Sequence, residues 1–151
     1  METPTREDFR FVEPLRVRWA DIDAQGIVFN PNYLVYADVG MTEYMRAIGY
    51  PYPECITPFG ADLFTVKSEA NYRSSALFDD LLDIAVRVSR IGTSSITYAF
   101  GIFRGEELLC DVAITYVAAA LDTKKPTPLP QPFIDKILEF EKTPPVRKAP
   151  A

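Results

Sequence analysis

The sequence predicts an α+β fold in which a five-stranded antiparallel sheet wraps around one long central helix. Three observations support this prediction. Apolar residues recur at helical spacing from residue 33 to residue 48. Four segments with period-two alternation follow, separated by short turns, and this pattern favours antiparallel hairpins. One more alternating segment precedes the helix and is expected to join the same sheet.

The first strand is expected at residues 15–20, because Leu15, Val17 and Trp19 fall on one face. Asn30 is a suitable N-cap for the helix that follows, and Pro31 suits the first helical position. Gly49 is placed to end that helix in the left-handed C′ conformation.

The later elements are expected in a simple order along the chain. Four strands are expected near residues 64–73, 82–88, 96–102 and 108–121. A short amphipathic helix carrying Phe133 to Leu138 follows a proline-rich run. We expect residues 13–141 to form a single domain, with a flexible N-terminus at 1–12 and a flexible C-terminal tail at 142–151.

Composition narrows the classes of partner. The 151 residues carry a net charge of −5, which argues against nucleic acid or an anionic membrane as the main partner. No apolar run is long enough to span a bilayer, and the N-terminus lacks the apolar core of a signal peptide. Cys55 and Cys110 give neither a disulfide framework nor a zinc spacing. We therefore expect a cytoplasmic protein with no metal.

The segment from Asp21 to Tyr33 carries the candidate chemistry. The chain has no histidine, so acid–base or nucleophilic chemistry near neutral pH needs another group. Asp21 and Asp23 lie in the turn between the first strand and the helix N-terminus. A helix N-terminus presents unpaired N–H groups that suit a developing oxyanion. Both aspartates also have a simpler interpretation, since aspartate commonly bonds local amides in turns.

This order of elements, together with several motifs, resembles the hotdog fold and, more closely, the 4-hydroxybenzoyl-CoA thioesterase family. The matching residues are Arg18 to Val28, Asn32-Tyr33, Thr42-Glu43-Tyr44, Ile48-Gly49, Ala70 to Arg73 and Phe78-Asp79-Asp80. The resemblance covers about residues 13 to 125. A bare D-x-D-x-x-G pattern would be weak evidence, but here it stands before the expected helix and strands.

The resemblance implies roles for particular residues. Asp23 matches the catalytic carboxylate, and the backbone amide of Asn30 matches the donor that polarises the thioester carbonyl. Many family members have histidine or tyrosine at the position of Asn30, so this chain departs from the family pattern there and keeps only the backbone donor. The resemblance further implies a homodimer or homotetramer with shared active sites, an acyl-CoA substrate and no metal or other cofactor.

Two candidate groups keep alternative interpretations. Asp38 matches an aspartate beside the substrate ring in the family, and a substrate-binding role and a structural role stay equally open. The side chains of Lys67, Arg73, Arg87, Arg90 and Arg104 are possible contacts for CoA phosphates. A solvated outer sheet face explains most of these basic residues better, so none is assigned.

The expected function is hydrolysis of an acyl-CoA thioester to a free acid and CoA. Asp23 would act as nucleophile or general base, and the helix N-terminus would stabilise the oxyanion. The alternatives are a thioesterase for acyl groups on acyl carrier protein, and a non-catalytic acyl-CoA-binding protein. Hotdog dehydratases are disfavoured because they normally pair histidine with a carboxylate.

Overall fold

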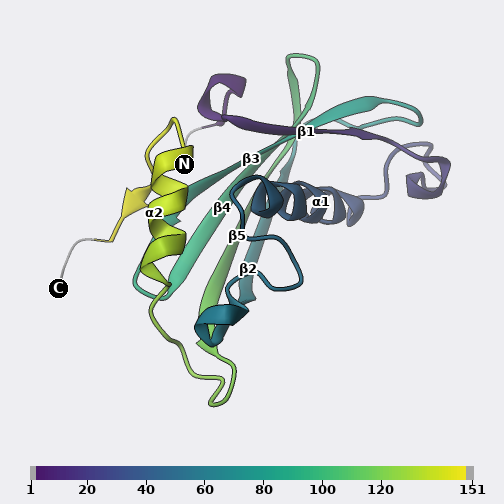
Figure 1. Cartoon of the computed structure of the whole chain (residues 1–151). Helices are drawn as coiled ribbons and strands as arrows, with labels where there is room; N and C mark the ends of the chain where they lie inside the picture. The colour runs from purple at the N-terminus through teal and green to yellow at the C-terminus, as the bar shows by residue number, and fades with distance from the viewer. Residues whose placement is uncertain (1–2, 149–151) are drawn as a thin grey trace.

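The computed structural model describes residues 3–148 and contains one antiparallel sheet around a central helix (Figure 1). The strand order is β1-β3-β4-β5-β2, so the predicted five-stranded sheet is confirmed. The elements are β1 (Phe11–Arg16), α1 (Asn32–Ala47), β2 (Ala61–Tyr72), β3 (Leu81–Ile91), β4 (Ser95–Arg104), β5 (Glu107–Ala120), α2 (Gln131–Phe140) and β6 (Val146–Arg147). The last, a two-residue strand, pairs with β3 in parallel.

The helix α1 crosses one face of the sheet, and the core lies between them (Figure 1). Its buried residues include Tyr36, Met41 and Tyr44, which pack with the inward rows of β3, β4 and β5. Gly40 allows a close approach, because a Cβ there would lie 2.6 Å from the Ile84 Cγ2 atom. Helix α1 has 16 residues and is of moderate length. The close approach at Gly40 sets the distance between α1 and β3, and therefore also the position of the helix N-terminus over the sheet.

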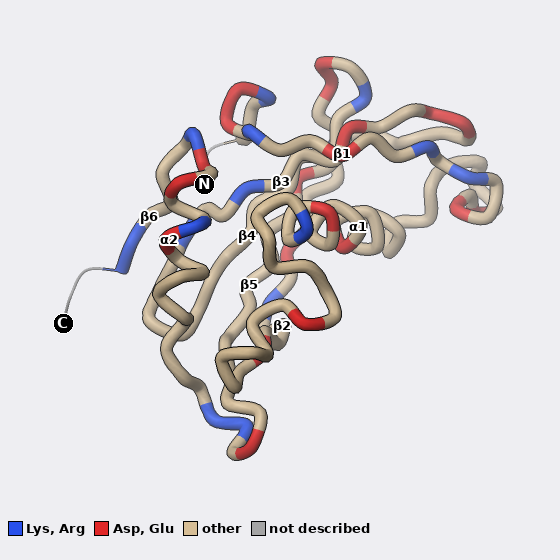
Figure 2. Tube along the Cα trace, viewed as in Figure 1, with Lys and Arg blue, Asp and Glu red and all other residues tan. Residues whose placement is uncertain are grey.

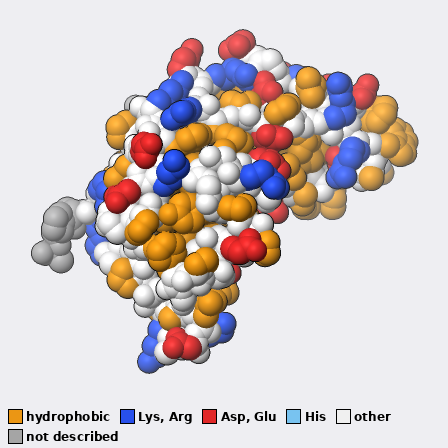
Figure 3. Space-filling model, viewed as in Figure 1, with side chains coloured by type: hydrophobic (Ala, Val, Ile, Leu, Met, Phe, Trp, Pro, Cys, Tyr) orange, Lys and Arg blue, Asp and Glu red, His pale blue; other side chains and the backbone are white. Residues whose placement is uncertain are grey.

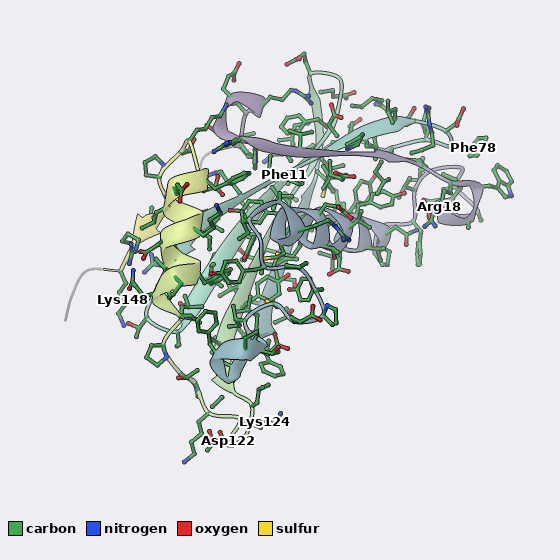
Figure 4. The ribbon with its side chains drawn as sticks, in the orientation of Figure 1. Phe11, Arg18, Phe78, Asp122, Lys124 and Lys148 are labelled. Carbon is green, nitrogen blue, oxygen red and sulfur yellow. The ribbon has the colours of Figure 1, made fainter. Side chains whose placement is uncertain are left out.

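The first strand differs from its prediction. Strand β1 ends at Arg16, and Trp19–Asp21 forms a short 3₁₀ helix, η2. The Arg18 backbone N–H donates to the Asp21 carboxylate at 3.0 Å, which closes this turn. Trp19 therefore lies outside the sheet, 73% exposed, with its ring edge-on to Phe78 at 5.3 Å. Apolar side chains gather at this end of the molecule, where Figure 4 labels Phe78 and Figure 3 shows the surface.

The predicted helix cap was also misplaced. Helix α1 begins at Asn32 with Pro31 at the N-cap position, and no side chain caps it. Asn30 is thus one residue outside the cap, although its carbonyl accepts the Tyr33 N–H at 3.3 Å. The C-terminal prediction is confirmed, since Gly49 has φ +88° directly after the C-cap residue.

The segments expected as flexible termini contain ordered elements. Residues 6–8 form a 3₁₀ turn, and β6 lies in the expected tail, while residues 1–2 and 149–151 fall outside the described range. Between α2 and β6, the buried Glu141 carboxylate accepts the Tyr44 hydroxyl at 2.6 Å and the Val88 N–H at 2.8 Å. Burial raises the pKa of Glu141, and these two hydrogen bonds oppose that rise. Glu141 therefore ties the end of α2 to both α1 and β3.

Candidate functional site

The turn between β1 and α1 is organised by the buried side chain of Asp21. Its carboxylate accepts hydrogen bonds from the Arg18 backbone at 3.0 Å and the Tyr36 hydroxyl at 2.8 Å. The Arg18 guanidinium adds an ion pair at 3.0 Å, although that arginine is largely exposed. Burial alone would raise the pKa of Asp21, but these donors outweigh it and hold the pKa below its ordinary value.

The backbone of Asp21 joins the other end of the turn to the helix. Its carbonyl accepts the Phe29 N–H at 2.9 Å and the Asn32 side-chain amide at 3.0 Å. One residue therefore connects the 3₁₀ turn, the segment before α1 and the first residue of α1. We infer that Asp21 sets the path of the chain on which Asp23 and Asn30 stand.

Asp23 lies at the tip of this turn and is half-buried. Its N–H donates to the Ile27 carbonyl at 2.9 Å, and its carboxylate accepts the Gln25 N–H at 2.8 Å. Gly26 has φ +78°, a conformation that glycine adopts without strain. One carboxylate oxygen thus makes the local bond expected of a turn aspartate, and the second oxygen accepts no bond within residues 3–148.

A cleft of about 250 Å³ opens at the N-terminal end of α1. It is lined by Ile27, Val28, Asn30, Tyr33, Tyr72, Arg73, Ser74 and Ser75. The Asn30 N–H finds no acceptor among the described residues. The Asn30 carbonyl accepts the Tyr72 hydroxyl at a long 3.4 Å. A free amide at a helix N-terminus, facing a cleft, can donate to a carbonyl oxygen that gains negative charge.

The structure brings some predicted residues together and separates others. Asn30 lines the cleft, and Asp23 lies beside it through its bond to Ile27, another lining residue. Asp38 is absent from the lining and lies about 9 Å along the helix axis from Asn32. It is exposed and lies near Tyr116, whose pKa is raised to about 12 by burial and by the Asp38 carboxylate.

The prediction from sequence assigned no role to the wall of the cleft opposite Asn30. Tyr72 is the last residue of β2, and Arg73, Ser74 and Ser75 follow it directly. About 40 positions separate them from Asn30, so only the pairing of β2 with β5 brings them there. The segment from Ala70 to Arg73 matched the family pattern, and that match was the available signal.

The described residues offer little to a metal ion. Nowhere in residues 3–148 do three or more histidine, cysteine, aspartate or glutamate side chains gather in a way that would hold one. In the same part of the chain, no helix is both long and apolar enough to cross a membrane.

We predict that Asp21→Asn destabilises the fold by about 1–3 kcal/mol at pH 7, because buried hydrogen bonds to a charged acceptor are lost. The pKa of Asp21 is lowered in the folded protein, so its contribution is present above the ordinary aspartate pKa. This contribution disappears as the pH falls through the folded-state pKa. Denaturant unfolding at several pH values measures the gap between wild type and variant.

The gap should narrow in acid, and a gap that is constant from pH 7 to pH 3 would contradict the account. Arg18→Gln is the matched control. It removes only the exposed ion-pair partner, so its effect on stability should be much smaller than that of Asp21→Asn at every pH.

Comparisons with known proteins identify the family and the fold. The family model of the Thioesterase superfamily matches residues 25–111. The chain is 28% identical over 125 residues to the acyl-CoA thioesterase YbgC of Haemophilus influenzae, which covers 82% of this chain and 91% of that protein.

Two solved structures have the same fold. A thioesterase superfamily protein from Jannaschia sp. CCS1 has a TM-score of 0.82 at 21% identity, over 93% of this chain and 99% of that one. A 1,4-dihydroxy-2-naphthoyl-CoA thioesterase from Synechocystis has a TM-score of 0.78 at 21% identity, over 85% and 96%. With the family match, the sheet wrapped around α1 and the turn at its N-terminus, the chain belongs to the Thioesterase superfamily and is a thioester hydrolase with the hotdog fold.

Proposed function

We propose that this protein hydrolyses acyl-CoA thioesters, with Asp23 as the catalytic carboxylate and the Asn30 amide as the oxyanion donor. The observation that carries the proposal is the free Asn30 N–H at the cleft, beside the turn that carries Asp23. The similarity to the acyl-CoA thioesterase YbgC supports CoA as the carrier of the acyl group.

The chemistry needs only these groups and water. The thioester carbonyl oxygen accepts the Asn30 N–H, which makes the carbonyl carbon more electrophilic. Asp23 attacks that carbon directly and expels the CoA thiolate, leaving a mixed anhydride that water hydrolyses. Alternatively, Asp23 takes a proton from water as the water attacks. In both routes the C–S bond breaks, the thiolate gains a proton and a free acid is released.

Replacing Asp23 by asparagine should lower kcat by about 10² or more, because the amide is neither a nucleophile nor a base of comparable strength. Thiol release from a panel of acyl-CoA substrates measures the rate. Asp79→Asn is the matched control: Asp79 is exposed and has φ +68°, which asparagine tolerates. A folded Asp23→Asn variant with the same kcat as Asp79→Asn would refute the role of Asp23.

The backbone of Asn30 is proposed to matter more than its side chain. Asn30→Ser keeps the N–H and should therefore cost far less than the 10²–10³-fold typical of a lost oxyanion donor. The same assay also separates an enzyme from a non-catalytic binding protein, because a binding protein would release no thiol as wild type or as any variant.

Asp38 is proposed to contact the acyl group at its far end. The side chain is on α1, and its carboxylate is second only to burial among the causes that raise the pKa of Tyr116. It is also the smallest of the causes that raise the pKa of Tyr52, of which burial is the largest. A hydroxylated aromatic acyl group could donate a hydrogen bond to Asp38, whereas a saturated chain could not.

Asp38→Ala should therefore reduce kcat/KM more for a hydroxybenzoyl thioester than for a short aliphatic thioester. The difference between the two losses should correspond to about 1–3 kcal/mol of activation free energy. The two substrates serve as controls for each other, because a general loss of activity affects both. Equal losses would leave Asp38 as a structural residue of α1.

The protein is proposed to act as a homo-oligomer, at least a dimer. Strand β2 has 12 residues, pairs on one side with β5, and carries Val66 60% exposed. Such a long edge strand is a template for pairing with another chain. An antiparallel pair of β2 strands centred on Ser68 would place Lys67 opposite Glu69 of the partner subunit.

Sedimentation at micromolar concentration should show a dimer or a larger oligomer. Lys67→Glu should weaken the assembly, because like charges then face each other across the two strands. The charge-swapped double variant, Lys67→Glu with Glu69→Lys, should restore it. A wild-type monomer with full activity would exclude a shared site.

A further inference from the structure

A second, larger hollow of about 580 Å³ lies on the face of the sheet that points away from α1. Its floor consists of small outward-facing side chains, Thr97 and Ala99 on the central strand β4 and Ala113 on its neighbour β5. Thr3 and Pro4 near the N-terminus line it, as do Thr143 and Val146 near the C-terminus. We call this hollow the outer groove.

The charged groups of the outer groove are unevenly satisfied. Each of its three carboxylates has a partner: Asp111 pairs with Arg73 at 2.7 Å, Glu69 with Lys67 at 3.2 Å, and Asp8 accepts the Thr5 N–H at 2.9 Å.

The two arginines that line the outer groove, Arg87 and Arg90, make no ion pair and no side-chain hydrogen bond within residues 3–148. The positive charge of Arg87 lowers the pKa of Glu141, but burial outweighs this effect and the two side chains do not form an ion pair. Arg147 of β6 and Lys148 add positive charge beside Arg90, in the blue segment near β6 in Figure 2. The β3 side of the outer groove therefore offers unused donors for an anion.

The outer groove and the cleft meet at one corner of the sheet. Asn71 and Asp111 line the outer groove, while Tyr72 and Arg73 line the cleft. The Arg73–Asp111 ion pair and the Asn71–Asp111 hydrogen bond at 3.1 Å form the shared boundary. A ligand chain leaving the cleft past Arg73 would enter the outer groove.

We propose that the outer groove binds the phosphate-bearing arm of the acyl-CoA substrate, with Arg87 and Arg90 as its phosphate contacts. This inference rests on the proposed function. It assigns a role to two of the basic residues left unassigned from the sequence, and it gives the substrate a path over the edge of the sheet from the Asn30 amide to β3.

The strand register gives the length of the path inside the outer groove. In the strand register, Ala113 is opposite Ala99, and Ala99 is opposite Arg87. Two strand spacings and a two-residue offset put the backbone of Arg87 about 12 Å from that of Asp111, and Arg90 is a few ångströms farther. A ligand arm that enters the groove past Arg73 can therefore run along this floor toward the two guanidinium groups.

The test compares two substrates with the same acyl group, one on CoA and one on N-acetylcysteamine, which lacks phosphates. The double variant Arg87→Gln/Arg90→Gln should raise KM for the CoA thioester about 10-fold or more, with kcat within about twofold. Kinetics with the N-acetylcysteamine thioester should not change. The control Arg16→Gln/Arg46→Gln has the same net charge, and neither of its arginines lines the outer groove, so it should behave like wild type.

A binding measurement separates this inference from the proposed function. Calorimetric titration with adenosine 3′,5′-bisphosphate should show binding by wild type and at least about 10-fold weaker binding by the double variant. Binding with this arginine dependence, but without thioester hydrolysis, would refute the proposed function and leave the anion site. Three results would overturn the outer groove proposal. The double variant could hydrolyse the CoA thioester with unchanged KM, or it could affect both thioesters equally. It could also lose its oligomers and still bind the bisphosphate as wild type does.

Discussion

The buried carboxylate of Asp21 is the group on which the rest of the candidate site depends. A carboxylate is costly to bury unless donors surround it, and here the donors come from the Arg18 backbone and from Tyr36 on α1. The requirement for those donors fixes the 3₁₀ turn against the helix. The Asp21 backbone carbonyl then accepts hydrogen bonds from the Phe29 N–H and the Asn32 side-chain amide. The two neighbouring functional candidates, Asp23 and Asn30, inherit their positions from these bonds.

The sheet supplies the second half of the site. The β2–β5 register ends with Tyr72 opposite Cys110, and the chain then turns at Arg73 and Ser74, whose N–H groups both donate to the Leu109 carbonyl. This turn faces the start of α1. The depth of α1 over the sheet depends on Gly40, since any side chain there would push the helix away from β3. The cleft is therefore set by packing at a distance as well as by its own lining.

The sequence was most informative where the pattern was periodic. The helix at residues 33–48 and the four later strands follow from apolar spacing alone, and each appears near its predicted position. Trp19 was misplaced because alternation of apolar residues does not reveal a turn closed by a carboxylate three residues on. The cap was misplaced because Asn30, although a good capping residue by type, precedes a proline that itself occupies the N-cap position.

The remaining features depend on contacts between residues far apart in the sequence. Tyr72 and Asn30 form one cleft only because a sheet edge meets a helix end. From the sequence, Arg87 and Arg90 are interpreted as ordinary solvated arginines. The structure shows that the carboxylates of the outer groove are already paired with other groups. Charge type can be read from a sequence, but whether a charge is already paired requires the fold.

The central claim is that the thioester oxygen binds the Asn30 amide. A ketone analogue of an acyl-CoA, with a methylene between sulfur and the carbonyl, keeps that oxygen but cannot be hydrolysed at the C–S bond. Titration of this analogue into ¹⁵N-labelled protein, followed by two-dimensional ¹H–¹⁵N NMR, reports on each backbone amide. The account predicts that the Asn30 resonance shifts downfield and is among those most affected. Saturating binding that leaves the Asn30 resonance unchanged, with the shifts elsewhere in the fold, would contradict it.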